Sequence, residues 1–471
     1  MLSTRHRTQR QWPRHSPNIE GVELGSRRNR YGAFDDSRRR EPNLQFVQDG
    51  QMNDLLVIGA GLAGLTAAYH AAKAGQTVKV IAKGMGVTHW HAGTIDVLGY
   101  TADGKGVARP LEAISKLLPE HPYRLLGAEQ LSVALAGFAA LAAELGLPYA
   151  GAQNAGDNLW LPSPVGAARP AFLSPAGQTA GDLSTGQPLL VVGVEGMRDF
   201  YPKLIAENLA RQGHAARHAF LPLSLFTPRH DVTTLQLAKL VEEPACLSQL
   251  AESLAWMVQP GERIGLPAIL GFDEHLAVLA RLGEASGALV FEIPTLPPSV
   301  PGIRLHTRLR RKLEAMGVRV EVGMEAIGYG AEEDRIGWVE TETSSRPLKH
   351  RAANFLLATG GILGGGINSD HAGRAWEVIF DLPLTIPQER GDWFRPHFLD
   401  GGGQPVFRGG VAVNDSFQPI RPDGSPVYAN LWAAGGTLAG ADGIRERSVE
   451  GIAISTGRVV ASALRNNPVE A

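Results

Sequence analysis

The chain has 471 residues, with 45 Lys or Arg against 47 Asp or Glu, so its formal net charge is −2. Because Cys246 is the single cysteine, this chain alone cannot form a disulfide, a cysteine-ligated zinc site or an iron–sulfur cluster. Hydrophobic residues make up 44% and charged residues 20%, which is close to the globular average and excludes global disorder.

Residues 1–51 differ in composition from the remainder of the chain. They hold ten Arg, no Lys and six acidic residues, a net charge of +4. They show no recurring apolar spacing, so burial cannot offset the entropy lost on ordering. We expect residues 1–51 to be a disordered or spurious extension, and we expect no nucleic-acid partner despite the arginines.

The first regular elements are expected directly after this segment. Asp54–Ile58 is an apolar run of strand length, and the glycine-rich turn Gly59–Gly64 and a helical pattern over 65–74 follow at once. A second apolar strand, Thr77–Ala82, completes a unit of about 30 residues. This order predicts a Rossmann-like FAD/NAD(P)-binding domain, and therefore an α/β fold.

Each glycine of the turn has a physical reason. Gly59 permits the tight turn, Gly61 lets the backbone approach a pyrophosphate, and Gly64 lets the helix pack on the strand. Leu62 lies in the same turn, where the helix N-terminus attracts phosphate. The acid expected about 20 residues further on, which would bind the adenosine ribose, is replaced by Lys83. Lys83 is a candidate phosphate ligand, and it leaves room for a cofactor without that ribose contact, such as FMN.

A polar and aromatic loop, Thr88–Asp96, follows the second strand. In flavoproteins of this architecture such a loop lies beside the isoalloxazine ring, so Gly93 and Thr94 are candidate cofactor contacts. His91 is the candidate catalytic base, because an imidazole titrates near neutrality. His89 and His91 have no third ligand at a suitable spacing, and we predict no metal site.

Residues 101–300 are expected to form a mixed α+β substrate or cap insertion. This stretch is rich in Pro and Gly, with a strand at Leu189–Val194 and a helix at Met197–Gln212. Its most apolar part, Leu131–Leu147, contains Glu144 and lacks the roughly 18 uncharged apolar residues of a membrane span. We expect a packed helix there.

The chain is expected to return to the flavin-binding domain, begun by residues 52–100, over residues 301–471. A helix at Arg304–Met316 and a strand at Val318–Val322 are followed by two strands that end in glycines, at 355–358 and 430–434, and by a helix at 449–464. Backbone N–H groups after such strands can bind a cofactor, and a helix dipole can stabilise reduced flavin. The candidate cofactor residues in this part are Thr359, Gly360, Gly435, Gly436 and Gly451.

The chain from about Met52 to Leu464 resembles one family of flavoprotein subunits, the B-type subunit of the bacterial anaerobic glycerol-3-phosphate dehydrogenase. Four stretches carry the resemblance: Thr88–Leu98, His121–Gly127, Val191–Phe200 and Pro294–Leu305. The resemblance implies a flavoprotein that oxidises sn-glycerol 3-phosphate to dihydroxyacetone phosphate. The family implies FMN, whereas the glycine fingerprint favours FAD.

The resemblance also implies partners and a location. Electrons would pass to a quinone through a membrane-associated iron–sulfur subunit, beside a second flavoprotein subunit. The chain would then be cytoplasmic, and peripheral on the membrane through a partner. Two alternatives stay open: a non-catalytic electron-relay subunit, and a fumarate-reductase-like FAD oxidoreductase acting on another substrate.

A phosphate-bearing substrate needs cationic partners, preferably Arg, whose planar fork binds two oxygens. The candidates are Arg304, beside the Pro-Pro-Ser turn, and Arg445 with Arg447, on the loop before the last helix. We predict that Arg304 and Arg447 bind substrate and that Arg445 and His91 are catalytic.

Overall fold

The computed structural model describes residues 52–227, 232–344 and 346–465, with the side chain of residue 465 left out. The expectations for residues 1–51 lie outside this part of the chain. Among the described residues, the strands of the main sheet are β1 (Asn53–Ile58), β2 (Val78–Ala82), β11 (Arg319–Val322), β12 (Ala326–Glu332), β13 (Arg335–Thr341), β14 (Leu348–Leu357) and β17 (Leu431–Ala433).

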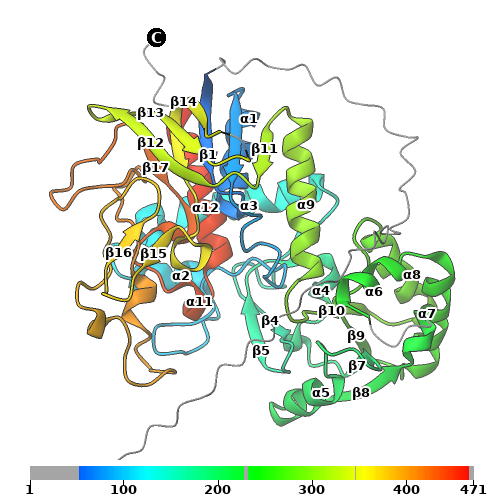
Figure 1. Ribbon diagram of the computed structural model, residues 1–471. Coiled ribbons are helices and arrows are strands. Elements are labelled where there is room, and N and C mark those ends of the chain that lie inside the picture. The colour runs from blue at the N-terminus through cyan, green and yellow to red at the C-terminus, as the bar shows by residue number, and fades with distance from the viewer. Residues whose placement is uncertain (1–51, 228–231, 345, 466–471) are drawn as a thin grey trace, which may run out of the picture. The chain divides into compact units, whose positions relative to one another are not determined.

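Five of these strands run parallel, in the order β11-β2-β1-β14-β17 (Figure 1). The strands β12 and β13 form an antiparallel hairpin that pairs with the first half of β14. All five residues of β2 and the last four of β1 are buried, as expected of parallel strands covered on both faces. The carboxyl ends of β1, β14 and β17 therefore lie at one edge of the sheet.

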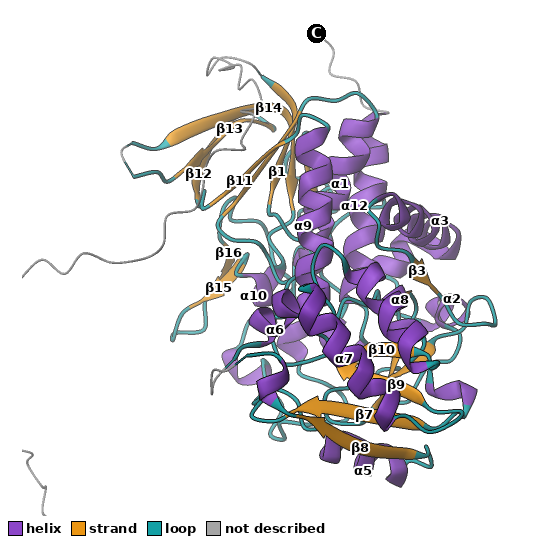
Figure 2. Cartoon of the chain, turned by 90° about the vertical axis from the view of Figure 1, so that its right-hand side faces the viewer, coloured by secondary structure: helices purple, strands orange, loops and turns teal. Residues whose placement is uncertain are grey.

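Four long helices pack with this sheet: α1 (Leu62–Lys73), α3 (Pro122–Glu144), α9 (Val300–Ala315) and α12 (Val449–Arg465). The helix α1 contacts both α9 and α12, and α12 contacts α3, as Figure 2 shows. The helix α9 begins four residues before the predicted start, because the Ser299 side chain accepts from the Gly302 N–H and caps it. The strand–turn–helix–strand segment at the start of the described chain and the last helix thus lie close to their predicted ranges.

A second sheet lies within the predicted insertion. It is entirely parallel, in the order β10-β9-β7-β8, with the strands β7 (Leu189–Val194), β8 (Ala216–Leu221), β9 (Arg263–Pro267) and β10 (Val290–Ile293). The helices α5 (Pro202–Arg211), α6 (Thr234–Leu240), α7 (Pro244–Met257) and α8 (His275–Ser286) belong to this part. Its apolar side chains form a hydrophobic core of their own, from Leu183 to Val300.

The insertion combines helices with both parallel and antiparallel strand pairs, in line with the predicted mixed α+β arrangement: its four-stranded sheet is parallel, and two short pairs within residues 149–175 are antiparallel. In addition, residues 114–147 contribute Leu131, Phe138 and other side chains to the core of the first sheet. The separate core thus begins well after residue 101.

The remaining elements are short. They are α2 (Pro110–Ala113), β3 (Tyr149–Ala150), β4 (Leu159–Pro162), β5 (Ala168–Ala171), β6 (Ser174–Pro175), α4 (Ala176–Thr179), α10 (Gly361–Gly364), β15 (Ile367–Ser369), β16 (Ala375–Glu377), α11 (Gly443–Glu446) and the 3₁₀ turns at 114–116, 183–185, 223–225, 390–392, 405–408 and 435–437. The hairpin β4–β5 carries a residue of the candidate site.

One described helix, α3, is long and apolar enough to cross a membrane by length and composition. It contains Arg124, Glu129 and Glu144, and it covers most of the range 131–147 for which a packed helix was expected. Part of α3 is buried, and side chains such as Leu135 and Phe138 lie in the core beside α12. Core packing accounts for the apolar character of this helix.

Candidate functional site

Three glycine turns meet at the carboxyl edge of the main sheet. Gly59 ends β1 with φ 122°, and a Cβ there would lie 2.2 Å from the Ala358 carbonyl oxygen at the end of β14. A Cβ on Gly361 would lie 2.1 Å from the carbonyl oxygen of Gly436, after β17. Glycine is required where these backbones approach, and the three predicted turns are brought together.

The turn after β1 is closed on one side and open on the other. A Cβ on Gly64 would lie 2.0 Å from the Gly59 carbonyl oxygen, so α1 packs directly on the turn. Gly61, the N-cap of α1, has no heavy atom of the described residues within 4 Å of its Cβ position, and no side chain caps the helix. The first N–H groups of α1 are thus left for an anion.

A buried cluster of charged and polar side chains surrounds Asp96, at the end of the Thr88–Asp96 loop. Its carboxylate accepts from the Thr94 hydroxyl at 2.8 Å and from the guanidinium of Arg447. The guanidinium of Arg169, on β5, donates to the Thr94 hydroxyl at 2.9 Å and to the Gln178 side chain at 3.1 Å. Two arginines and one carboxylate therefore meet here: Arg169 and Asp96 are buried, whereas the Arg447 side chain is 29% exposed.

The Nε atoms of Arg169 and Arg447 are buried without a hydrogen-bond partner in the described part of the chain. Burial lowers the pKa of Arg169 to about 10, so its guanidinium remains cationic at pH 7. An additional anion in this cluster would supply acceptors for these N–H groups.

Glu450, in the first turn of α12, is the second acid near these arginines. Burial, and then the charge of Asp96, raise the pKa of Glu450 to about 8, although Arg447 and Arg169 act in the opposite direction. Glu450 is therefore mostly protonated at pH 7. With Glu450 neutral, two guanidinium groups face the single charge of Asp96, and the cluster has a net charge of +1.

Similarity to known proteins identifies the family of this chain. The FAD binding domain family matches residues 54–452. The probable anaerobic glycerol-3-phosphate dehydrogenase B-type subunit of Halobacterium salinarum is 33% identical over 425 residues, which are 87% of this chain and 97% of that protein. The chain belongs to the FAD binding domain family, and within it to the B-type subunits of anaerobic glycerol-3-phosphate dehydrogenase. It is an FAD-binding oxidoreductase.

A second relative agrees with this assignment. The anaerobic glycerol-3-phosphate dehydrogenase B-type subunit of Pectobacterium atrosepticum is 31% identical over 421 residues, 87% of this chain and 98% of that protein. Among solved structures, the open conformation of a flavocytochrome c3 fumarate reductase has a TM-score of 0.41 and 12% identity, over 88% of this chain and 78% of that one.

The residues at the sheet edge fit FAD. The open position at Gly61 and the uncapped start of α1 suit a pyrophosphate. Thr359, after β14, and Thr437, after β17, have buried hydroxyls without a partner among the described residues, and each can bond a polar cofactor atom. We expect the flavin end to reach the neighbouring Thr88–Asp96 loop.

His91 does not have the geometry of the predicted base. Its Nδ1 accepts from the Gly93 N–H at 2.8 Å, so the proton of the neutral ring is assigned to Nε2. Burial lowers the pKa of His91 to about 4, so the ring is neutral at pH 7. The buried Nε2 has no partner among the described residues, and it can act only as a donor because the lone pair that accepts is on Nδ1.

Arg304 is a correction to the predicted substrate contacts. Its guanidinium forms a bidentate pair with the carboxylate of Glu292 at 2.9 and 2.8 Å, and its Nε donates to the Gly271 carbonyl at 2.7 Å. The Arg304 and Glu292 side chains are 2% and 0% exposed. Arg304 joins α9 to β10. Its Nε, Nη1 and Nη2 atoms all donate to protein acceptors, so they do not bind a phosphate.

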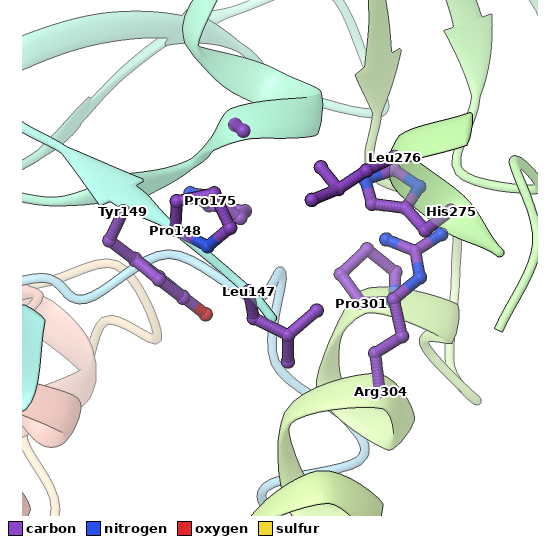
Figure 3. A pocket seen from close by; sticks show the side chains of 9 residues that line it. Leu147, Pro148, Tyr149, Pro175, His275, Leu276, Pro301 and Arg304 are labelled. Carbon is purple, nitrogen blue, oxygen red and sulfur yellow. The ribbon is translucent and has the colours of Figure 1, made fainter. Parts of the chain in front are cut away.

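A small cavity beside Arg304 does not change this conclusion. Figure 3 shows Arg304 and His275 next to Pro175, Tyr149 and Leu147 around it. Its volume is about 10 Å³, which is room for about one water. A larger hollow of about 420 Å³, lined by residues between Gly373 and Trp393, contains none of the predicted site residues.

Arg445 and Gly451 are also placed differently from their prediction. The Arg445 guanidinium donates to the backbone carbonyls of Ala102 and Asp400, at 2.9 and 2.7 Å, and so ties two loops together. A Cβ on Gly451 would lie 2.2 Å from the Tyr123 hydroxyl oxygen, and its N–H bonds to the Asp96 carbonyl. Gly451 is a packing glycine, without space for a cofactor.

The other predicted cofactor residues have mixed positions. Gly360 and Gly436 lie in the converging turns. The N–H of Gly435 donates to the Thr456 hydroxyl at 2.9 Å, so it is not available to a cofactor. The Gly93 carbonyl accepts from the Tyr149 hydroxyl at 2.6 Å. Leu62 is buried at the start of α1. Lys83 follows β2 and forms an ion pair with Glu325 at 2.8 Å.

Sequence reasoning missed Arg169, Asp96, Gln178 and Glu450. The signal for Asp96 was present, because it lies in a stretch that carries the family resemblance. Arg169 and Gln178 lie in the insertion, where no motif singles them out. In the described part of the chain, no group of three His, Cys, Asp or Glu side chains is placed to hold a metal ion.

Proposed function

We propose that this FAD-binding chain oxidises sn-glycerol 3-phosphate to dihydroxyacetone phosphate. The names of its relatives supply the substrate. The observation that supports it best is the pair of arginines, Arg169 and Arg447, each with a buried Nε that has no hydrogen-bond partner among the described residues. A phosphate binds best to charged, planar donors in a site with little water.

The cluster gives each side chain a separate task. Arg169 and Arg447 bind and orient the phosphate, while Asp96 holds Arg447 in place. His91 donates from Nε2 to an oxygen of the substrate. At pH 7 only the minority of molecules with Glu450 ionised can use it as a base; in these molecules Glu450 receives the hydroxyl proton, and the raised pKa of this carboxyl makes it a stronger base than an ordinary carboxylate. FAD, when bound, supplies the hydride acceptor.

We further propose that electrons leave through other subunits. The curated relatives are named as one subunit of a larger dehydrogenase, and the chain has one cysteine, which is too few for an iron–sulfur cluster of its own. A membrane-associated iron–sulfur subunit would carry electrons to a quinone, beside a second flavoprotein subunit. The chain would then lie on the cytoplasmic side, peripheral to the membrane.

Anaerobic stopped-flow mixing with glycerol 3-phosphate tests this function. The FAD-loaded chain is expected to lose its visible flavin absorbance. Arg169→Lys and Arg447→Lys keep the positive charge but lose the planar guanidinium, which can donate two parallel hydrogen bonds to a phosphate. The apparent substrate affinity should therefore fall on the order of 10-fold. Arg445→Met is the matched control, because that guanidinium bonds backbone carbonyls.

The same experiment separates the alternatives. If the isolated chain is not bleached whereas the assembled complex is, the chain is an electron-relay subunit. If another hydroxy acid or an enoate reacts instead, the substrate is wrong although the oxidoreductase assignment stands. If both lysine variants retain the affinity of the unmodified chain, the phosphate does not bind in this cluster.

A further inference from the structure

The carboxyl end of β2 lacks the acid that usually binds the adenosine ribose of a dinucleotide. Lys83 occupies this place, and its ammonium group bonds the carboxylate of Glu325 through Oε1 at 2.8 Å. Glu325 lies at the end of β2 although it is far from β2 in the sequence. It follows β11, which runs parallel to β2.

Backbone hydrogen bonds fix Glu325 at this strand end. The N–H groups of Gly323 and Met324 both donate to the Ala82 carbonyl, at 2.8 and 2.9 Å. Ala82 is the last residue of β2. The carboxylate of Glu325 is thus held beside the position where the missing acid would start.

The Lys83–Glu325 pair lies at the same edge as the glycine turn. Residues 84–87 lead from Lys83 back to that turn, and a Cβ on Gly86 would lie 2.8 Å from the Cα of Gly61. In open parallel sheets, ligands bind outside the carboxyl ends of the strands. A dinucleotide whose pyrophosphate lies at Gly61 would have its adenosine half at this edge.

Stability does not explain the position of this pair. The side chains of Lys83 and Glu325 are 76% and 44% exposed, and exposed pairs contribute about 0–1 kcal/mol. A second pair, Lys79–Glu321 at 2.9 Å, lies within β2 and β11 themselves, and its lysine side chain is only 8% exposed. That pair ties β2 to β11 without the help of Glu325.

We propose that Glu325, positioned by Lys83, binds the ribose hydroxyls of the adenosine half of FAD. Its carboxylate oxygens are acceptors for the 2′- and 3′-hydroxyls, and Lys83 holds the carboxylate through Oε1. An acid from the neighbouring strand thereby replaces the acid that β2 lacks. The inference rests on the FAD assignment and adds a residue that selects the adenosine-containing flavin.

Titration of the apoprotein with FAD and with FMN tests the proposal, with binding followed by flavin fluorescence. FMN has no adenosine, so Glu325→Gln should lower the affinity for FAD about 10-fold or more and leave that for FMN unchanged. Lys83→Met should lower the FAD affinity less. Glu332→Gln, at an exposed acid at the end of β12, is the matched control and should change neither affinity.

Three outcomes would overturn the proposal. Glu325→Gln could bind FAD as tightly as the unmodified chain, or it could lose FAD and FMN equally. Lys83→Met could weaken FAD whereas Glu325→Gln does not, which would assign the contact to the lysine charge. In each case flavin reduction by glycerol 3-phosphate remains a separate measurement, so the proposed function is judged independently.

Discussion

Burial decides what an arginine can do, and Arg304 and Arg447 show the two cases. Arg304 is saturated by Glu292 and a backbone carbonyl, whereas Arg447 retains an unpartnered Nε. Both were predicted as substrate ligands, because their positions along the chain looked equally suitable. Sequence position does not tell whether an acid such as Glu292 will lie opposite a cation.

Arg304→Met is expected to destabilise the fold without weakening the substrate contact. Removing one partner leaves the charge of Glu292 buried and unpaired, at a cost of about 3–5 kcal/mol in the free energy of unfolding. Urea denaturation measures this loss. The double variant Arg304→Met with Glu292→Met should recover much of it, since no buried charge remains. A normal stability together with a lost substrate affinity would restore Arg304 as a substrate ligand.

Glu450 gives a pH dependence of stability with a defined sign. Its pKa in the folded state, about 8, lies above the ordinary value of 4.5, mainly because of burial. The folded protein therefore binds the proton more tightly than the unfolded chain. The stabilisation is fully present below about pH 4.5 and is lost as the pH rises through about 8.

Melting temperatures of the unmodified chain and of Glu450→Gln between pH 5 and about 9 check this sign. The variant keeps a neutral side chain at every pH, so its melting temperature should fall less steeply. The difference between the two proteins is the quantity to compare, because it removes the contribution of other groups, such as the buried Glu377. Parallel curves would show that Glu450 titrates normally.

At the scale of elements, two glycines of the turn after β1 have different roles: Gly64 is needed for packing, and Gly61 for FAD binding. A methyl group on Gly64 would meet the Gly59 carbonyl oxygen, so Gly64→Ala should cost about 1–3 kcal/mol of stability. A methyl group on Gly61 meets no described atom, so Gly61→Ala should fold normally. It should nevertheless lower the FAD affinity about 10-fold or more, because the methyl group occupies the space for the pyrophosphate.

Thermal melts and FAD titrations of both variants provide the test. Gly283→Ala, within α8, is the control, since a Cβ there makes an ordinary 3.5 Å contact and should leave FAD binding unchanged. The assignment of the site fails if Gly61→Ala binds FAD as the unmodified chain does. It also fails if Gly61→Ala loses stability as Gly64→Ala does.

The strongly patterned elements could be predicted from the sequence. The strands β1 and β2 and the glycine turn have local signals, a buried apolar run and a fixed glycine spacing, and they occur where predicted. The strand β8 has no such signal, because it reads Ala-Arg-His-Ala-Phe-Leu and only Leu221 is fully buried. The helix α5 begins at Pro202, five residues after its predicted start.

The candidate site could be predicted only in part, because it is built by the whole molecule. The Thr88–Asp96 loop, Arg169 on β5 and Arg447 before α12 are separated by many residues and meet in one cluster. The family-like stretch before α9 packs on that loop, since the Ser299 N–H donates to the His89 carbonyl at 2.8 Å. These partners are too far apart in the sequence to form one local motif. Only the Thr88–Asp96 loop and Arg447 were therefore predicted as parts of the site.

The helix α9 links the two hydrophobic cores. Val300, at its start, belongs to the core of the second sheet, whereas Leu305, Leu309 and Leu313 belong to the core of the first. The Arg304–Glu292 pair lies on the same helix and joins it to β10. The helix α4, which follows β5 and Arg169 in the chain, also contacts β10, so two helices set the position of the second sheet relative to the candidate site.

Residues 1–51 are rich in Arg and have no recurring apolar spacing, so we expect no contribution from them to a hydrophobic core. The predicted cofactor and substrate residues lie beyond this segment, and the two larger sheets and cores are formed among the described residues from Asn53 onward. A variant lacking residues 1–51 is therefore expected to bind one FAD and to melt at the same temperature as the full chain. Calorimetry and the ratio of flavin to protein absorbance measure both quantities. A melting temperature lower by more than about 4 °C, on the order of 1 kcal/mol or more, would show that the segment packs on the rest of the protein.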